Sequence, residues 1–166
     1  MASGDFIDEI GVAVLPHHMR RLVDQIMASS ADNLAKLNLK TPPRAVSTML
    51  LLDREGELAI TRIAERLRLS HPQVIRNVRD MIAAGLASDR LSKTDRRVRI
   101  VKLTRRGQSE ARLLADHLRR VEQLYRQLFD EIGADLFEAT LRASAALQTK
   151  SYAERYEELL EEEIGA

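Results

Sequence analysis

Residues 70–107 read SHPQVIRNVRDMIAAGLASDRLSKTDRRVRIVKLTRRG, and the fold expected for the whole chain follows from them. The stretch opens with Ser-His-Pro, which favours a helix start because serine caps the first turn and proline is tolerated there. Gly85 suits the position just after the last turn of that helix. Between these signals, apolar side chains recur at helical spacing and predict one buried face: Val74, Val78, Met81 and Ile82.

Two short strand-like runs follow, residues 87–91 and 98–103, and they predict a β-hairpin with a polar tip at residues 92–97. A single acid, Asp95, lies among eight basic residues between positions 90 and 106: Arg90, Lys93, Arg96, Arg97, Arg99, Lys102, Arg105 and Arg106. On a chain of net charge +1, this is a local basic patch. A polar-faced helix beside a basic hairpin predicts DNA binding, with the helix in a major groove and the hairpin at a minor groove or the phosphates.

The same residues resemble the winged helix-turn-helix of MarR-type bacterial transcription regulators. Four short motifs carry the resemblance: LSHP at residues 69–72, AGL at 84–86, DRR at 95–97 and LTRRG at 103–107. The resemblance covers roughly residues 34–147. It implies a mainly α-helical fold with a small β-hairpin wing, flanked by long N- and C-terminal dimerisation helices.

By this resemblance, Arg97 is the wing arginine that enters a minor groove, and Asp95 positions it through an ion pair. Narrow minor grooves concentrate negative potential and attract arginine, which agrees with that role. The alternative is that the hairpin tip is simply solvated and contacts no DNA. For the polar face of the helix, the alternative is an ordinary exposed surface without a DNA contact. The residues expected to contact DNA are Arg44, Ser70, His71, Gln73, Arg76, Asn77, Asp95, Arg96 and Arg97.

Two apolar stripes outside this lobe predict a dimer. One lies on a helix expected to begin near Pro16, and the other is a heptad-like seam between Ala111 and Ile132. The expected interface residues are Leu15, Met19, Leu22, Leu114, Leu118, Val121, Tyr125 and Leu128. This organisation predicts N-terminal dimerisation helices at 1–40, the DNA-binding lobe at 41–104 and C-terminal dimerisation helices at 105–166, intertwined as one domain. The acidic end, SYAERYEELLEEEIGA, is most simply a solvated helix face.

Composition excludes several classes of site. The chain has no cysteine, so disulfides, zinc–thiolate sites and thiol redox sensing are excluded. His17 and His18 are adjacent and point about 100° apart on a helix, so they do not predict a metal site. We find no nucleophile–base pattern and no phosphate-binding glycine loop, and we expect neither an enzyme nor a cofactor. Without a signal peptide or a long apolar run, the expected location is the cytoplasm.

The sequence therefore predicts a homodimeric, sequence-specific regulator of transcription, expected to act as a repressor on a pseudo-palindromic operator. The resemblance also implies a small-molecule pocket between the dimer helices and the DNA-binding lobe, with Met19, Val23, Met49 and Leu118 as possible wall residues. The effector is not identified by the sequence. Two alternatives stay open: an architectural DNA-binding protein without effector control, and a protein-interaction module built on the same fold.

Overall fold

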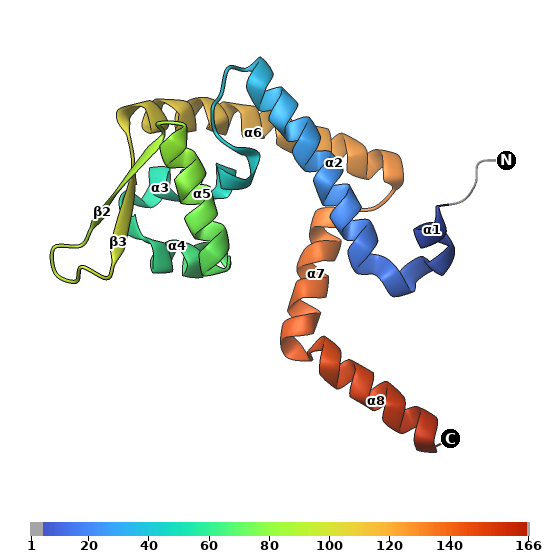
Figure 1. The fold of residues 1–166 in the computed structure, drawn as a ribbon. Coiled ribbons are helices and arrows are strands. Elements are labelled where there is room, and N and C mark those ends of the chain that lie inside the picture. Colours follow the sequence, from blue (N-terminus) through green and yellow to red (C-terminus); the bar gives the residue numbers. More distant parts are fainter. Residues whose placement is uncertain (1–4, 166) are drawn as a thin grey trace. The chain divides into compact units, whose positions relative to one another are not determined.

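The computed structural model describes residues 5–165, which divide between Asp116 and His117 into two compact units (Figure 1). In chain order the helices and strands are α1 (Phe6–Ile10), the 3-10 helix η1 (Gly11–Val14), α2 (Leu15–Lys36), the 3-10 helix η2 (Pro43–Ala45), α3 (Val46–Glu55), β1 (Leu58–Ala59), α4 (Ile60–Leu67), α5 (His71–Ala83), β2 (Ala87–Leu91), β3 (Arg99–Leu103), α6 (Arg105–Ile132), α7 (Leu136–Thr149) and α8 (Tyr152–Gly165). The predicted fold class is confirmed: the described chain is mostly helical with a small β-sheet wing.

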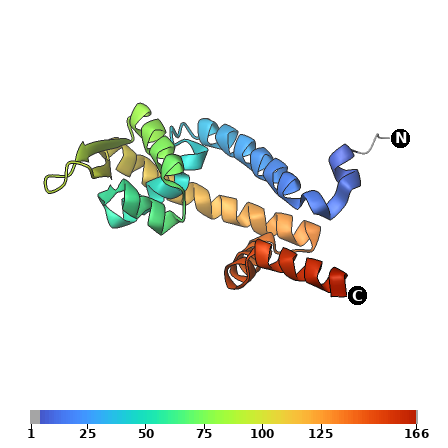
Figure 2. The ribbon, with the colours of Figure 1, turned by 60° about the horizontal axis from the view of Figure 1, so that its bottom comes forward.

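The sheet has three antiparallel strands in the order β1-β3-β2. Its hairpin pairs Ala87 with Leu103 and Leu91 with Arg99, and β1 pairs Leu58 with Val101. The Ser92 N–H donates to the Val98 carbonyl oxygen at 2.8 Å, which closes the hairpin below its tip. The hairpin projects beyond the helices of the lobe, as Figure 2 shows, so its tip is accessible to a large partner.

The core of the first unit lies between α3, α4, α5 and the sheet. The predicted apolar face of α5 is buried there through Val74, Val78 and Met81. The other large side chains that are fully buried include Met49, Ile63, Leu86, Val101 and Leu114. Leu114 corrects one prediction: because its exposed fraction is 0%, it belongs to the core of this unit and has no surface left for a dimer interface.

The turn between α4 and α5 depends on a residue with left-handed backbone conformation. Arg68 has φ 52°, although glycine is the usual residue there because a side chain disfavours this region. Its N–H donates to Glu65 and the Leu69 N–H donates to Ala64, so two carbonyls at the end of α4 are satisfied. Asn38 ends the segment after α2 in the same way, with φ 57°.

The junction of the wing and α6 explains the LTRRG motif. The Thr104 hydroxyl accepts the Gly107 N–H at 3.0 Å and donates to the Gly85 carbonyl at 2.8 Å, so it caps α6 and ties it to the end of α5. A Cβ atom on Gly107 would lie 2.0 Å from the Leu86 carbonyl oxygen. Only glycine fits at this position without moving the backbone.

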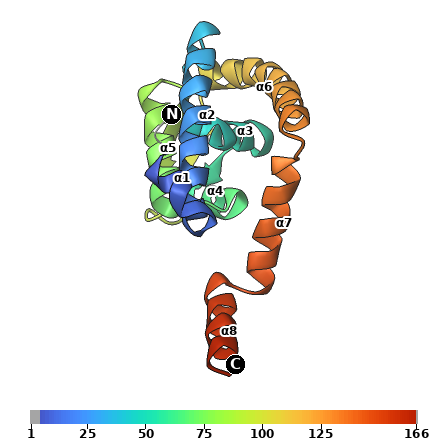
Figure 3. The same ribbon diagram turned by 90° about the vertical axis from the view of Figure 1, so that its right-hand side faces the viewer.

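The second unit comprises the part of α6 from His117 onward, with α7 and α8. Figure 3 shows α7 and α8 as successive helices with a bend between them. Asp135 caps α7 by accepting the Glu138 N–H at 2.8 Å. No side chain among the described residues 117–164 is buried. Along residues 5–165, no helix has the length and apolar character needed to cross a membrane.

A buried carboxylate joins α6 to the segment after α2. The Oε1 atom of Glu110 accepts the backbone N–H groups of Lys40 and Thr41, each at 2.6 Å, and the Thr41 hydroxyl at 2.7 Å. Glu110 and Thr41 are only 7% and 3% exposed. Three donors on one carboxylate oxygen are satisfied at this largely buried junction, so the acid stabilises the path of the chain into η2.

We predict that Glu110→Ala lowers the free energy of unfolding by about 3 kcal/mol, because it leaves buried donors without an acceptor. Urea unfolding followed by circular dichroism measures this loss. Glu110→Gln keeps an acceptor oxygen of similar reach and is the matched control, with a smaller loss expected. An alanine variant as stable as the parent would contradict the assigned role.

Candidate nucleic-acid interface

The first turn of α5 presents polar side chains on a capped helix start. Ser70 and Gln73 form a capping box. The Gln73 Oε1 atom accepts the Ser70 backbone N–H at 3.0 Å and the Ser70 hydroxyl at 2.8 Å. His71, Gln73 and Arg76 are exposed along this face, as the sequence predicted. The arrangement gives a rigid, polar N-terminal turn of the kind that reads base edges in helix-turn-helix proteins.

Asn77 is the exception among the helix residues expected at DNA. It is only 6% exposed, and its Nδ2 group donates to the Thr48 hydroxyl of α3 at 3.3 Å. Its position beside the apolar face places it under α3 rather than on the outer surface. The burial of Asn77 therefore removes it from the candidate DNA contacts, and its amide instead joins α5 to α3.

The wing tip holds Arg97 by its backbone and by its side chain. Asp95 Oδ1 accepts the Arg97 backbone N–H at 2.9 Å, and the guanidinium Nε lies 3.3 Å from the same oxygen. The backbone N–H, and then the guanidinium, lower the pKa of Asp95 below its ordinary value. The acid is therefore ionised at neutral pH. The Arg97 side chain is 91% exposed, so its guanidinium is available to a partner.

The charge of the wing is lower than the sequence alone suggested. Arg90 pairs with Glu57 at 2.9 Å and Arg99 pairs with Asp89 at 3.0 Å, so two acids outside the 90–106 interval offset two of its cations. The remaining basic residues have no acidic partner among residues 5–165: Lys93, Arg96, Lys102, Arg105 and Arg106. The patch is therefore concentrated at the hairpin tip and at its base.

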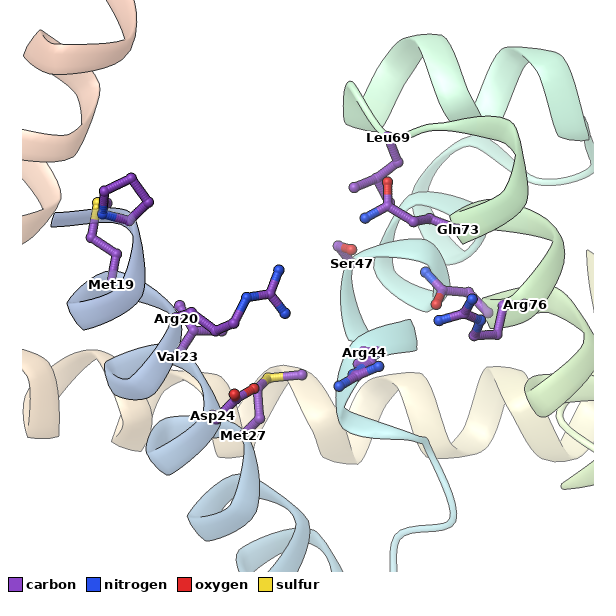
Figure 4. A pocket seen from close by; sticks show the side chains of 12 residues that line it. Met19, Arg20, Val23, Asp24, Met27, Arg44, Ser47, Leu69, Gln73 and Arg76 are labelled. Atoms are coloured by element: carbon purple, nitrogen blue, oxygen red, sulfur yellow. The ribbon is translucent and has the colours of Figure 1, made fainter. Parts of the chain in front are cut away.

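A cavity of about 740 Å³ lies between α2 and the face of the lobe that carries α3 and α5 (Figure 4). Three arginines from different elements line it: Arg20 on α2, Arg44 in η2 and Arg76 on α5. Figure 4 shows Arg20 extending from α2 toward the side that carries Arg44 and Arg76. Besides Arg20, the α2 wall consists of four apolar residues and one acid: Pro16, Met19, Val23, Met27 and Asp24.

Two of the four wall residues expected from the sequence line this cavity. Met19 and Val23 line it as expected, whereas Met49 is fully buried in the core. Leu118 lies in the second unit and is not among the lining residues. Arg20 and Asp24 were missed, although both lie one helical turn or less from the apolar residues that were named. The helical spacing of polar and apolar residues on α2 was the signal that could have found them.

The remaining residues expected at a dimer interface keep accessible surface. Leu15 and Met19 are each 50% exposed and Leu22 is 41% exposed on α2. Those on α6 are half-buried: Leu118, Val121, Tyr125 and Leu128. Tyr125 stacks on Phe129 with ring centroids 6.1 Å apart. Both stripes thus offer apolar surface to another subunit.

His17 and His18 lie side by side near the start of α2. The rings of His17 and His18 are 6.4 Å apart at 84°, and His18 Nδ1 lies 3.6 Å from Asp8 Oδ1. Among the residues that the structure describes, no three histidine or acidic side chains gather as metal ligands would. The unpaired cations are the chemically distinctive groups of this surface.

Comparisons with known proteins agree with this geometry. The model of the MarR family matches residues 40–98, which include η2, the helix-turn-helix and most of the wing. No curated protein sequence matches the chain. The match therefore centres on the first unit, from η2 to the hairpin tip, rather than on the flanking helices.

Several solved structures share the fold. MarR is 22% identical, covering 82% of this chain and 98% of its own, with a TM-score of 0.60. The transcriptional regulator BldR from Sulfolobus solfataricus is 19% identical, covering 88% of this chain and 99% of its own, with a TM-score of 0.56. FabT from Streptococcus pneumoniae, solved in complex with DNA, is 16% identical, covering 87% and 98%, with a TM-score of 0.52. The chain thus shares the fold of these solved structures, and its residues 40–98 match the model of the MarR family.

Proposed function

We propose that this chain is a homodimeric regulator that reads a specific double-stranded DNA sequence, and that it represses transcription until a small-molecule effector releases it. One observation carries the proposal. A capped helix turn with exposed Gln73 and Arg76 and a hairpin tip with exposed Arg97 belong to the same lobe. Relatives with this fold include a protein solved on DNA.

The proposed docking on DNA follows from the shapes of α5 and of the wing. A major groove admits an α-helix, and the first turn of α5 carries the side chains that would reach base edges or phosphates. Arg97 at the wing tip suits a narrow minor groove beside that helix. Arg44 is exposed in η2 and suits a phosphate contact. Phosphate contacts position the lobe, and base contacts from the helix supply sequence preference.

A dimer is favoured by the apolar surfaces that the chain leaves uncovered. The α2 stripe is about half exposed, and the described part of the second unit has no buried side chain. Contiguous apolar surface of this kind is rare on stable monomers. Twofold symmetry would then place two lobes on a pseudo-palindromic operator with half-sites about 10 base pairs apart.

Effector control is supported by the cavity beside the lobe. Its volume of about 740 Å³ is in the range of small-molecule sites, and its mainly apolar α2 wall, which also carries Arg20, faces Arg44 and Arg76. Arg44 and Arg76 line the cavity and also belong to the proposed DNA contacts. A ligand that binds them better in one arrangement of the lobes would shift the protein away from the DNA-binding state.

We predict that Arg97→Ala weakens binding to the preferred operator and reduces the slope of log K against log salt by about one unit, because one phosphate-neutralising cation is lost. Discrimination should weaken in the A·T-rich flank rather than at the half-site core. Fluorescence anisotropy on operator and scrambled duplexes at several salt concentrations measures both effects.

Two control variants distinguish the loss of a specific DNA contact from the loss of one positive charge. Lys93→Ala removes a cation of the hairpin tip that does not pair with Asp95. It should lower the operator affinity less than Arg97→Ala does. Arg142→Ala removes the same charge from α7, where the side chain pairs with Glu138, and should leave the salt slope unchanged. If Arg97→Ala binds the operator as tightly as the parent at every salt concentration, the wing is not a DNA contact.

We predict that the chain is a dimer at micromolar concentration and that Leu22→Glu makes it a monomer, since a buried unpaired charge opposes association. Sedimentation velocity gives the mass directly. Leu91→Glu introduces the same charge at a 55% exposed apolar position on β2 and should leave the dimer intact. A parent chain that sediments as a folded monomer removes the basis for a twofold operator.

A further inference from the structure

The capping box of α5 limits what Gln73 can do at a base. A glutamine amide has one oxygen with two lone pairs and one nitrogen with two N–H donors. Both Ser70 donors, the backbone N–H at 3.0 Å and the hydroxyl at 2.8 Å, point to the Gln73 oxygen. A backbone N–H requires an acceptor, so the oxygen must face Ser70 and its lone pairs are occupied.

The Nε2 nitrogen of the same amide has no hydrogen-bond partner within the described residues. Gln73 is exposed. Figure 4 shows the side chain extending from α5 into the open cavity, of which Gln73 is a lining residue. Towards a partner molecule, Gln73 is therefore a pure hydrogen-bond donor in the conformation that caps its own helix.

Gln73 therefore cannot make the bidentate contact by which glutamine usually recognises adenine. Glutamine reads adenine with both ends of the amide, accepting from N6 and donating to N7, which needs a vacant oxygen. Of the bases in the major groove, guanine alone presents two adjacent acceptors, O6 and N7, whereas cytosine presents the N4 donor. We propose that Gln73 selects guanine over adenine and cytosine at one position of each half-site, acting as donor only. This inference rests on the proposed DNA-binding function.

The sharpest test is Gln73→Glu. The carboxylate keeps an oxygen for Ser70, and glutamate at this position of a capping box is favourable, so the helix should form as before. Its second oxygen replaces the amide nitrogen, which converts the outward group from donor to acceptor. An acceptor repels guanine O6 and N7 and suits cytosine N4.

The experiment begins with duplexes that the parent protein selects from a random pool, and each base pair of the selected site is then replaced in turn. On the parent site, Gln73→Glu should lose on the order of tenfold in affinity at one base pair of each half-site. At that position its preference should change from guanine to cytosine, with the other positions unchanged. Replacing that guanine by 7-deazaguanine should weaken the parent protein but not the variant.

Gln108→Glu is the matched control for the added charge, because Gln108 is exposed in the first part of α6 outside the recognition helix. It should weaken binding to all sequences alike. A variant Gln73→Glu that keeps the parent's base preference overturns the inference and leaves the proposed function standing. A parent site with adenine at this position, whose affinity falls when the N6 amino group is removed, overturns it too. A chain that selects no sequence overturns both.

Discussion

The close approach of α6 to the backbone of Leu86 determines how the helices and the wing of the first unit are held together. The absence of a side chain at Gly107 allows this contact, and Thr104 bonds to the end of α5 and to the first turn of α6. The end of α5, the base of the wing and the start of α6 thus meet at one junction. Because protein interiors are close-packed, such a junction transmits a shift of one element to the others. Any change in the position of α6 would therefore reach the recognition helix through this contact.

The groups that orient the wing tip, Asp95 and Arg97, are accessible to solvent. Surface ion pairs contribute little stability, so the pairing of Asp95 with Arg97 is better understood as orientation of the hairpin tip. The lowered pKa of Asp95 keeps it charged above its ordinary titration range and through mildly acidic conditions, and the interaction is lost only as pH falls through the lowered value. Arg97 enters the proposed contact with little further ordering of its backbone.

Local sequence signals were sufficient for the elements of the lobe. The Ser-His-Pro start, the apolar period of α5 and the glycine after it predicted a capped helix with the correct buried face. The hairpin was also evident, because turn chemistry and alternation depend on neighbouring residues. The family motif then placed Arg97 at the tip.

What the sequence could not show depends on contacts between distant residues. Asn77 is buried because Thr48 of α3 lies against it, and nothing near Asn77 in the chain indicates that neighbour. Leu114 fits the heptad spacing of α6, yet the first part of that helix packs into the lobe core, so the pattern alone could not separate core from interface. Glu57 and Asp89 offset wing arginines from outside the basic interval. The occupied oxygen of Gln73 is visible only from the three-dimensional capping geometry.

The central claim is that two lobes of a symmetric dimer read one duplex. The most direct test is the symmetry of the sequences that the purified chain selects from a random DNA pool, combined with the number of chains bound per selected duplex. The account predicts an inverted repeat with half-site centres about 10 base pairs apart, bound by two chains. Selected sequences without twofold symmetry, or saturation of the duplex by one chain, would contradict it.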